Sequence, residues 1–591
     1  MNPKFLIAVV LTAGLVACAQ KPQTQSLEIE ELPGIEAQTL LNDAQSAIED
    51  GQFRNADPLL QQLQQRPLNP NEQLQLDLLM LELALQRKSV ANAKAVLDTI
   101  DQPTLRNSPE DQQIRYGLLK ARYFELNGNY LTAARERDFL SGILEGDVKQ
   151  QNHQAIWSNL LSLEMESLLK WAEQAANTQF AQWLQLAAIA KDPAYTLEEH
   201  LTAVQQWRQA HPAHPASVEL PGGLSLLEEI AREQPKHIAL LLPLTGSLAN
   251  SGKAVRDGFM AAYYQTLQRG YQVPEISIID TEAAGSMELA YGDAIALGAE
   301  WAVGPLNKKS VSELAQLEQL PLPTLALNYA DEADLSETPD ELFQFGLAAE
   351  DEAILIAEQA YQQGHRRVLA FLPDNAWGQR IYQAFESRWL ELGGEIAEQR
   401  FYQQQKDYNP EIKALLNVDD SQKRYKTVRR LMRESMEFEP RRRQDVDWVF
   451  MVALPKQGRQ IRPMFDFNFA GDLPVYSTSH IFSGTANRKK DNDLNGIYFT
   501  DLPWLLENPE LKQQVEKSQK QARGAYSRLY AMGVDAFRLY PRLTQLSAFP
   551  NSKIFGVTGA LSMDQQHKIH RQTRFARFRA GRPVPITLSK D

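Results

Sequence analysis

Apolar residues recur with two different periods along this chain of 591 residues, and the change between them falls near Lys236. From residue 27 to residue 210 the spacing is three and four, as in Leu74, Leu78 and Leu81, which is typical of amphipathic helices. From residue 236 onward, short apolar runs alternate with helical segments, which predicts parallel sheets with helices on both faces. We therefore expect an all-α region followed by an α/β region, since the chain is too long for one core.

The helical region contains a weak internal repeat. Three groups of residues share the same offsets, namely Gly51, Phe53 and Ala56, then Lys88, Val90 and Ala93, then Gly128, Tyr130 and Ala133. We expect the alanine to let paired helices approach, and the larger residue to fill the groove between them. This pattern resembles degenerate tetratricopeptide-type hairpins, although their period is shorter, about 34 residues. The alternative is a generic helical bundle with chance matches. Either arrangement places these residues in the core and offers an extended surface for protein contact.

Prolines and glycines punctuate residues 211–235, which predicts a linker. Two runs of alternating strands and helices follow, one from residue 236 and one from about residue 350, and they predict two lobes with a cleft between them. The expected domain from 236 to 591 contains strands at 237–243, 276–280, 302–305, 323–327, 367–373, 447–454, 473–476 and 496–500.

The N-terminus has the pattern of a secretion signal. Lys4 precedes an apolar stretch from residue 5 to residue 17, which is shorter than the roughly 20 residues that cross a bilayer. Cys18 follows and is the single cysteine of the chain, so no internal disulfide can form. The alternative is an ordinary or uncleaved signal with a chance cysteine.

Residues 15–18, Leu-Val-Ala-Cys, resemble the lipobox of bacterial lipoproteins, in which the thiol receives a lipid. The resemblance implies a signal peptide at 1–17, lipidation of Cys18 and a polar tether at 18–26. Ala19, where an Asp would hold a lipoprotein at the inner membrane, implies the periplasmic face of the outer membrane.

The net charge of −13 argues against nucleic acid as a partner, because phosphate binding usually requires a basic surface. One segment is nevertheless basic, an insertion at about 417–446. Lys426, Arg429, Arg430 and Arg433 would share one face of a helix there. This insertion is either a docking patch for an acidic partner or a solvated loop. The candidate partner-binding residues are Lys423, Arg424, Lys426, Arg429, Arg430 and Arg433.

Motifs for catalysis and cofactors are missing. Gly246 to Lys253 imitates a phosphate-binding loop, but it has the wrong spacing, and Ala254 stands where a Ser or Thr would hold Mg²⁺. His567 and His570 have no carboxylate at metal-ligand spacing, so we expect no metal, no cofactor and no catalytic residues. The basic run from Arg571 to Arg582 is expected to be a tail packed on the domain.

Several loops resemble type I periplasmic binding proteins, the fold of the Leu/Ile/Val-binding type. The matching segments are 242–258, 303–305, 323–328 and 374–378, in the order that this fold requires. The resemblance covers residues 236 to about 558 and implies a small-molecule cleft near Thr245, Gly246, Ser247, Asn328 and Trp377. The alternative is that these residues only shape turns. Residues 477–480, Ser-Thr-Ser-His, lack the carboxylate with which amino-acid binders of this fold hold an ammonium group.

The complete arrangement, a lipobox, a tetratricopeptide-like region, a linker and a binding-protein-like region with a basic insertion, resembles the LpoA family of outer-membrane penicillin-binding protein activators. This resemblance implies a protein without enzymatic activity that binds a bifunctional class A penicillin-binding protein and stimulates its peptidoglycan transpeptidase. The alternative function is a lipid-anchored periplasmic receptor that binds a small molecule in the interlobe cleft. A wall-polymer hydrolase is a third class, and no motif in the sequence favours it.

Overall fold

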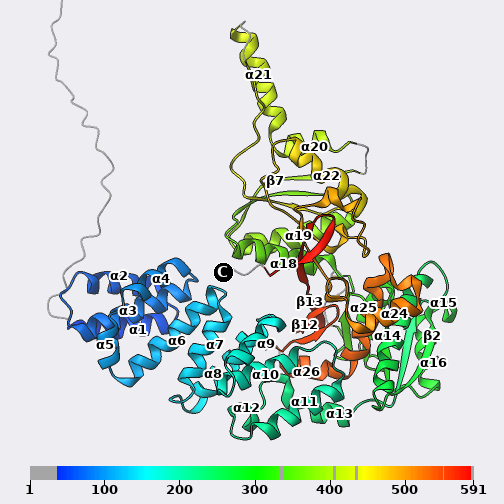
Figure 1. Cartoon of the computed structure of the whole chain (residues 1–591), viewed down its shortest axis with the longest axis horizontal. Helices are drawn as coiled ribbons and strands as arrows, with labels where there is room; N and C mark the ends of the chain where they lie inside the picture. Colours follow the sequence, from blue (N-terminus) through cyan, green and yellow to red (C-terminus); the bar gives the residue numbers. More distant parts are fainter. Residues whose placement is uncertain (1–35, 332–337, 404–406, 433–436, 550–551, 588–591) are drawn as a thin grey trace, which may run out of the picture. The chain divides into compact units, whose positions relative to one another are not determined.

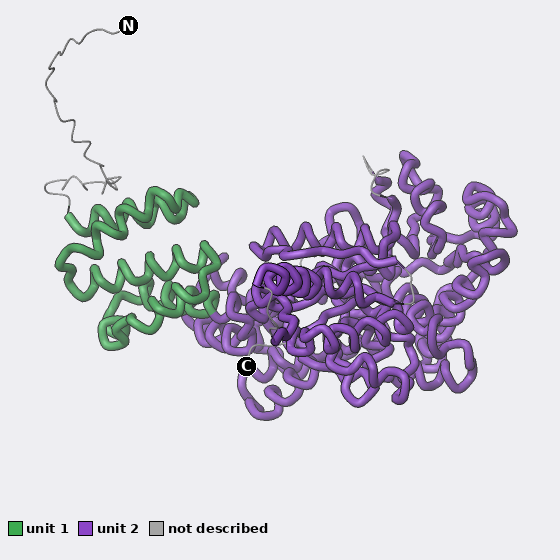
Figure 2. The backbone as a smooth tube through the Cα atoms, turned by 90° about the horizontal axis from the view of Figure 1, so that it is seen from above, with its two compact units in different colours: residues 1–123 green, residues 124–591 purple. Residues whose placement is uncertain are grey.

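The computed structural model of the protein describes residues 36–331, 338–403, 407–432, 437–549 and 552–587 (Figure 1). The chain forms two compact units, Met1–Tyr123 and Phe124–Asp591 (Figure 2). The predicted signal, the tether with Cys18, and Arg433 of the predicted docking patch lie outside the described residues. No described helix is both long enough and apolar enough to span a bilayer.

The first unit is helical. Its core is built from buried leucines and alanines of successive helices, including Leu41, Ala44, Leu63 and Leu79. α3 begins with a capping box in which Asn69 and Glu72 satisfy each other's backbone N–H groups. The helices are α1 (Ala37–Glu49), α2 (Phe53–Gln64), α3 (Pro70–Gln86), α4 (Val90–Thr99), α5 (Gln102–Asn107) and α6 (Glu110–Leu126), the last of which continues into the second unit.

The repeated residues occupy equivalent turns, each of which joins two successive helices. The first residue of each group turns the chain in the left-handed region, with φ values of 71° at Gly51, 54° at Lys88 and 77° at Gly128. The second helix of each hairpin begins two residues later, and the alanine of each group, Ala56, Ala93 and Ala133, has no exposed surface. In the first two hairpins, α1–α2 and α3–α4, the two helices pack against each other, so small side chains lie where paired helices approach, as the spacing predicted.

Helices continue into the second unit up to Arg232. They surround a core that contains Trp183, Leu184 and Trp207. The helices are α7 (Tyr130–Leu140), α8 (Gly146–Leu161), α9 (Met165–Gln174), α10 (Gln179–Lys191), α11 (Leu197–Ala210), α12 (Pro215–Val218) and α13 (Leu227–Arg232).

The segment predicted to be a linker, residues 211–235, is folded. α12 begins at Pro215 and is capped by the His214 side chain, whose Nδ1 accepts a backbone N–H at 3.1 Å. In α13, Leu227 is fully buried in the helical core. Proline and glycine delimit short helices here, and the same composition is typical of linkers, which is why the sequence suggested one.

The first lobe of the α/β region is built on an eight-stranded sheet with the order β11-β12-β13-β5-β4-β3-β1-β2. The strands from β5 to β2 are all parallel, whereas β11, β12 and β13 pair antiparallel with one another. The strands are β1 (His237–Leu242), β2 (Glu275–Asp280), β3 (Trp301–Val303), β4 (Thr324–Ala326), β5 (Leu342–Phe345), β11 (Ile554–Gly556), β12 (Gly559–Met563) and β13 (Lys568–Gln572).

The second lobe is built on a seven-stranded sheet with the order β15-β14-β10-β9-β8-β6-β7. Its central strands are parallel and fully buried, so they are apolar without alternation. The strands are β6 (Arg367–Pro373), β7 (Glu395–Tyr402), β8 (Trp448–Met451), β9 (Val475–Ser477), β10 (Tyr498–Asp501), β14 (Arg574–Arg579) and β15 (Arg582–Pro585).

Helices cover both faces of each sheet, as strand–helix alternation predicts. In the first lobe, α14 and α25 bury one face. In the second lobe, α18 and α19 cover one face, and α20 and α22 cover the other. The helices are α14 (Ala249–Gln268), α15 (Thr281–Ala284), α16 (Met287–Ala296), α17 (Lys308–Ala315), α18 (Ala349–Gln362), α19 (Ala376–Glu391), α20 (Asn409–Leu415), α21 (Val418–Met432), α22 (Pro455–Phe467), α23 (Pro503–Leu506), α24 (Glu510–Ser518), α25 (Ser527–Leu539) and α26 (Leu543–Ala548).

We expected the C-terminal basic run to be a tail packed on the domain, and this prediction is wrong. The run forms strands of both sheets. In β14, buried Phe575 and Phe578 lie among more exposed arginines, and the strand pairs antiparallel with β10. Arginine side chains can place their apolar stems on a sheet and keep the guanidinium exposed, so a basic run is compatible with a strand. Both sheets are consequently mixed rather than purely parallel.

Candidate functional site

The basic insertion contains α21, the helix at the top of Figure 1. Five of the six predicted partner-binding residues lie on it, and all five are exposed. Lys423 makes ion pairs with Asp419 at 3.0 Å and with Asp420 at 2.9 Å, within the first turns of the helix. Within the described ranges, no ion pair involves the other four residues, Arg424, Lys426, Arg429 and Arg430. These four cations remain available to an outside partner.

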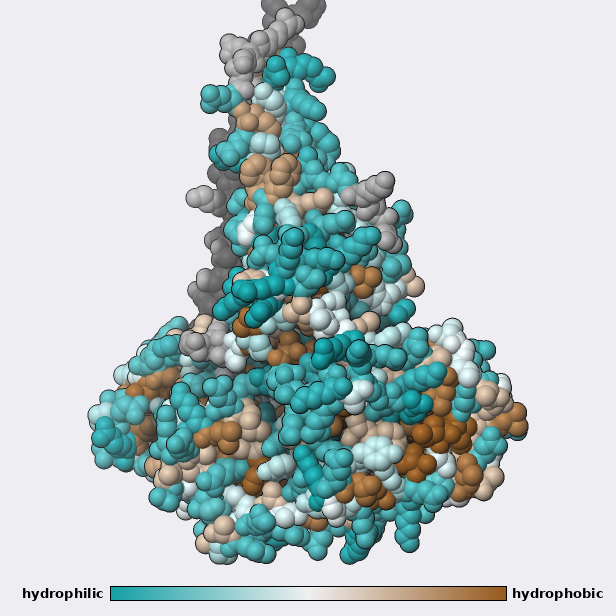
Figure 3. Space-filling view, turned by 45° about the vertical axis from the view of Figure 1, so that its right-hand side comes forward, coloured by the Kyte–Doolittle hydropathy of each residue, from teal (hydrophilic) through white to brown (hydrophobic). Residues whose placement is uncertain are grey.

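An apolar stripe runs beside the basic face of α21. The side chains of Leu431 and Met432 are 73% and 59% exposed, which is unusual for residues of this size. Tyr425, Val428 and Met432 have the spacing i, i+3 and i+7, so they share one side of the helix. The upper part of Figure 3 shows mainly hydrophilic surface with apolar side chains among it. A basic face beside an apolar stripe is the pattern of a helix that docks into a groove.

The base of the insertion is held by two further arginines, Arg442 and Arg443. Arg442 is buried, donates from Nε to the Phe469 carbonyl at 2.8 Å, and pairs with Asp472. Arg443 pairs with Asp445 at 2.8 Å and donates from Nη1 to the Ala397 carbonyl of β7 at 3.4 Å. These two side chains fasten the returning segment to the lobe, so their role is structural.

A second exposed apolar surface lies on the first lobe. It surrounds β2, an edge strand of the eight-stranded sheet, and Figure 3 shows apolar side chains gathered at its lower right, over this part of the lobe. The exposed residues are Tyr264, Leu267, Ile278, Leu289, Ile295 and Leu297. Nothing in the sequence pattern had singled out this surface.

The five residues of the predicted cleft do not line one common cavity. Thr245, Gly246 and Ser247 are exposed in the loop after β1. The Asn328 side chain is engaged in a turn, where Nδ2 donates to the Leu306 carbonyl at 3.1 Å and Oδ1 accepts the Tyr329 N–H at 3.0 Å. Of the five, Trp377 alone lines the cavity described next.

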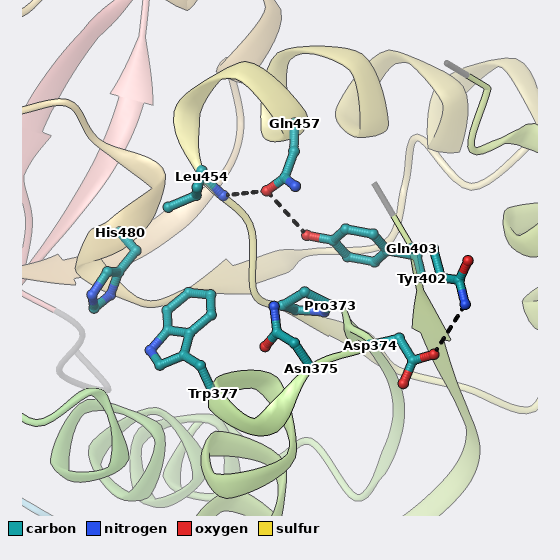
Figure 4. Close-up of a pocket in the computed structure, with 9 residues that line it drawn as sticks. All are labelled: Pro373, Asp374, Asn375, Trp377, Tyr402, Gln403, Leu454, Gln457 and His480. Atoms are coloured by element: carbon teal, nitrogen blue, oxygen red, sulfur yellow. Dashed lines mark hydrogen bonds between the residues drawn. The ribbon is translucent and has the colours of Figure 1, made fainter. Parts of the chain in front are cut away.

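That cavity has a volume of about 500 Å³ and lies entirely within the second lobe (Figure 4). It opens at the carboxyl ends of β6, β7, β8 and β9, the edge at which parallel α/β sheets usually bind ligands. Gly378, at the start of α19, permits the close approach of the helix, since a Cβ there would lie 2.1 Å from the Pro373 carbonyl oxygen. The lining residues are Pro373, Asp374, Asn375, Trp377, Tyr402, Gln403, Leu454, Gln457 and His480.

His480 forms one end of the cavity and stacks edge-on against Trp377, with ring centroids 4.9 Å apart. Burial, together with the positive charges of Arg528 and Arg571, lowers the pKa of His480 to about 3. The imidazole is therefore neutral at physiological pH. Its Nδ1 is buried without a hydrogen-bond partner among the described residues.

The loop that carries His480 is held by charged groups of the interlobe connections. Glu352 accepts the Ser479 backbone N–H at 2.7 Å and the Ser479 hydroxyl at 2.9 Å. Burial raises the pKa of the Glu352 carboxyl to about 7, and Arg571 opposes this shift. Residues 477–480 lack the carboxylate with which amino-acid binders of this fold hold an ammonium group, and Glu352 of α18 places a carboxylate beside them. That carboxylate already accepts two hydrogen bonds from Ser479.

Arg528 of the first lobe ties the same loop to β10. It pairs with the fully buried Asp501 at 2.6 Å and donates to the carbonyl oxygens of Ser479 and Phe482 at 2.8 and 3.0 Å. Because Arg528 satisfies Asp501 and two loop carbonyl oxygens at once, the buried ion pair fixes the position of the loop relative to β10. In the part of the chain that the structure describes, no cluster of three or more His, Cys, Asp or Glu residues could hold a metal ion.

The sequence found part of this cavity and missed the rest. Asp374, Asn375 and Trp377 belong to a motif that the sequence already indicated, whereas Tyr402, Leu454 and Gln457 had no motif. A signal existed in their position, since Tyr402 is the last residue of β7, and Leu454 and Gln457 follow the end of β8.

These features define a class, a protein with a two-lobed fold like that of periplasmic binding proteins behind an all-α region, as predicted. Over residues 27–581 the sequence matches the LppC lipoprotein family, and the chain belongs to that family.

Comparison with individual proteins confirms the resemblance that the sequence indicated. The chain is 29% identical over 544 residues to the penicillin-binding protein activator LpoA of Photobacterium profundum. The aligned region covers 91% of this chain and 87% of that protein. The chain is 28% identical over 599 residues to LpoA of Vibrio cholerae, covering 97% of both. The solved structure of LpoA from Haemophilus influenzae has the same fold, with a TM-score of 0.54 and 24% identity over 93% of this chain and 94% of that one.

Proposed function

We propose that this protein is an outer-membrane lipoprotein, anchored through Cys18 on the periplasmic face, that binds a bifunctional class A penicillin-binding protein and stimulates its peptidoglycan transpeptidase. The similarity to relatives named penicillin-binding protein activator, along nearly the whole of both chains, carries the proposal. In this proposal the protein catalyses nothing itself. It shifts the synthase because it binds the active conformation more tightly than the inactive one.

We further propose that α21 forms part of the partner surface. Its exposed cations, Arg424, Lys426, Arg429 and Arg430, would steer an acidic partner toward it, and Lys423 and Arg433 would extend the same patch. The apolar stripe would then enter a groove, with Leu431 and Met432 as the residues that lose most water. This assignment requires a partner whose groove is apolar and whose rim is acidic.

A triple charge reversal tests the surface. The variant Lys426→Glu, Arg429→Glu, Arg430→Glu is expected to weaken binding of a purified class A synthase about tenfold, mainly through slower association, and to reduce stimulation of crosslinking in parallel. Binding by the unaltered protein should weaken as salt is raised, because the exposed charges are screened.

The matched control changes the same number of exposed cations elsewhere in the second lobe, with Arg488→Glu, Lys489→Glu, Lys490→Glu. This control should bind like the unaltered protein. Equal binding by both triple variants would remove α21 from the partner surface. Absence of binding to every class A synthase tested would overturn the proposed function itself.

The rival function, a solute receptor that closes on a ligand between two lobes, is less well supported. Among the described residues, the 500 Å³ cavity is lined by the second lobe alone, and the first-lobe residues predicted to face a ligand do not contribute to it.

A further inference from the structure

The cavity of the second lobe is built for a ligand without negative charge. Its volume of about 500 Å³ falls in the range of small-molecule sites. Among its described lining residues there is no Lys or Arg, and Asp374 is the one carboxylate. His480 is neutral, since burial lowers its pKa to about 3. Among the described lining residues, an anionic ligand would find no cation to compensate the loss of its hydration.

Three side-chain amides of the lining each use one polar group in a hydrogen bond within the protein and leave the other polar group free. Asn375 Oδ1 accepts the Gly378 N–H at 2.8 Å, and Gln457 Oε1 accepts the Leu454 N–H at 3.0 Å. Within the described residues, the NH₂ groups of both amides make no hydrogen bond. Gln403 donates to Asp374 at 3.5 Å, which leaves its own carbonyl oxygen free. The cavity thus offers preorganised donors and acceptors side by side.

An aromatic wall completes the site. Trp377 is half-buried and held by its edge-on contact with His480, while Tyr402 is buried and anchored by its hydroxyl, which donates to the Val452 carbonyl at 2.7 Å. Figure 4 shows Trp377, Asn375 and Asp374 along one side of the cavity, and Leu454 and Gln457 along the other. Trp377 therefore presents an indole beside the free amide groups.

Sugars match this combination. A pyranose has C–H groups that pack on an indole, and a rim of hydroxyls that each donate and accept one hydrogen bond. Free amide N–H groups complement the acceptor side of those hydroxyls, and Asp374 and Gln403 complement the donor side. A ligand with one strong charge would use only a minority of these groups.

We propose that this cavity binds a short neutral saccharide, with a sugar face on Trp377 and its hydroxyls on Asn375, Gln457 and Asp374. The inference is independent of the proposed function, because partner binding through α21 needs no ligand in the cavity. It adds a second recognition property to the same lobe.

Calorimetric titration and ligand-observed NMR on the full-length protein test the proposal with three neutral probes, N,N′-diacetylchitobiose, cellobiose and maltose. Spermidine and glutamate serve as cationic and anionic probes. We expect saturable millimolar binding of at least one disaccharide and none of glutamate. Binding of spermidine alone, of glutamate, or of no probe would overturn the proposal.

Variants locate the site. Trp377→Ala should weaken disaccharide binding at least tenfold, whereas Trp171→Ala, which removes an indole from α9 in the helical part, should leave it unchanged. Gln457→Leu removes a free amide without emptying the cavity and should weaken binding several-fold, which keeps the test valid if Trp377→Ala misfolds. Full binding by both cavity variants would place the saccharide elsewhere and refute the assignment.

Discussion

His570 lies between two carboxylates from different elements. The sequence indicated no carboxylate partner for this residue, and the fold brings both to it. Its Nδ1 is 3.0 Å from Asp351 of α18, and its Nε2 is 2.9 Å from Asp564 in the turn between β12 and β13. The Tyr329 hydroxyl donates to the same Asp351 at 3.1 Å. The hydrogen bonds to Asp351 and Asp564 raise the pKa of His570 to about 9. The imidazole therefore acts as a positively charged link between the start of α18 and the β12–β13 turn.

This link predicts a pH-dependent stability. Because the pKa of His570 is about 9 in the folded state and near 6.5 in the unfolded chain, its contribution is complete below about pH 6.5 and lost as pH rises through 9. With allowance for its partial exposure, we expect a loss of about 1 kcal/mol in the free energy of unfolding, measured by urea titration across this range. His570→Gln should lack that loss. Parallel pH profiles for the two proteins would contradict the assignment.

At the scale of elements, the closest helix pair of the first lobe is α14 and α25. A Cβ on Gly258 would lie 2.0 Å from the Tyr530 carbonyl oxygen, and one on Gly533 would lie 2.0 Å from the Val255 carbonyl oxygen. The helices touch through their backbones at these two points, and the resulting interface buries Phe259 against Phe537, with ring centroids 5.2 Å apart. The crossing depends on two residues that have no side chain.

Gly533→Ala should therefore push the two helices apart. We expect a loss of about 3 kcal/mol in the free energy of unfolding, the upper end of the cost of overpacking a core. Gly292→Ala in α16 is the matched control, since no atom lies within 4 Å of a Cβ placed there. That control should stabilise by up to about 1 kcal/mol, because alanine is the better helix former. Chemical denaturation of both variants measures the difference.

At the scale of the whole molecule, the helices after residue 124 form one unit with the α/β region. Arg269 pairs with Glu199 at 2.6 Å, Arg574 pairs with Glu164 at 2.9 Å, and Arg538 donates to the Pro193 carbonyl. Lys191 lies 4.3 Å from the centroid of the Phe555 ring. The predicted boundary at 211–235 therefore runs through a continuous set of contacts.

Two fragments distinguish the boundary predicted at 211–235 from the division between the two units at Tyr123 and Phe124. Residues 109–591, which retain α6 intact, should unfold at the same temperature as the corresponding transition of the full chain. Residues 236–591 lose the contacts of Glu164, Pro193 and Glu199, and should melt about 4 °C lower, equivalent to roughly 3 kcal/mol. Scanning calorimetry measures both transitions. Equal melting temperatures for the two fragments would favour the boundary predicted from the sequence.

Much of the architecture was predictable because its signals are local. Strand–helix alternation, the hairpin alanines and the motif at residues 374–378 each depend on neighbours within a few turns of chain. The cavity was predictable only in part, because its lining comes from four strand ends that are far apart in sequence. The first-lobe cleft residues were placed by analogy with a fold, and backbone groups of Leu306 and Tyr329 engage the Asn328 side chain instead.

The sequence by itself determined the apolar periods, the turn at each helical hairpin, and the short apolar stretch before Cys18, because each is written in consecutive residues. Tertiary structure decided which polar groups are free and which are used. Arg442 is buried and Lys426 is exposed, although both belong to the same basic insertion. The sequence does not distinguish them, because the burial of Arg442 depends on distant partners such as Asp472. Likewise, Glu352 supports a loop 127 residues away, and only the folded sheet brings the two together.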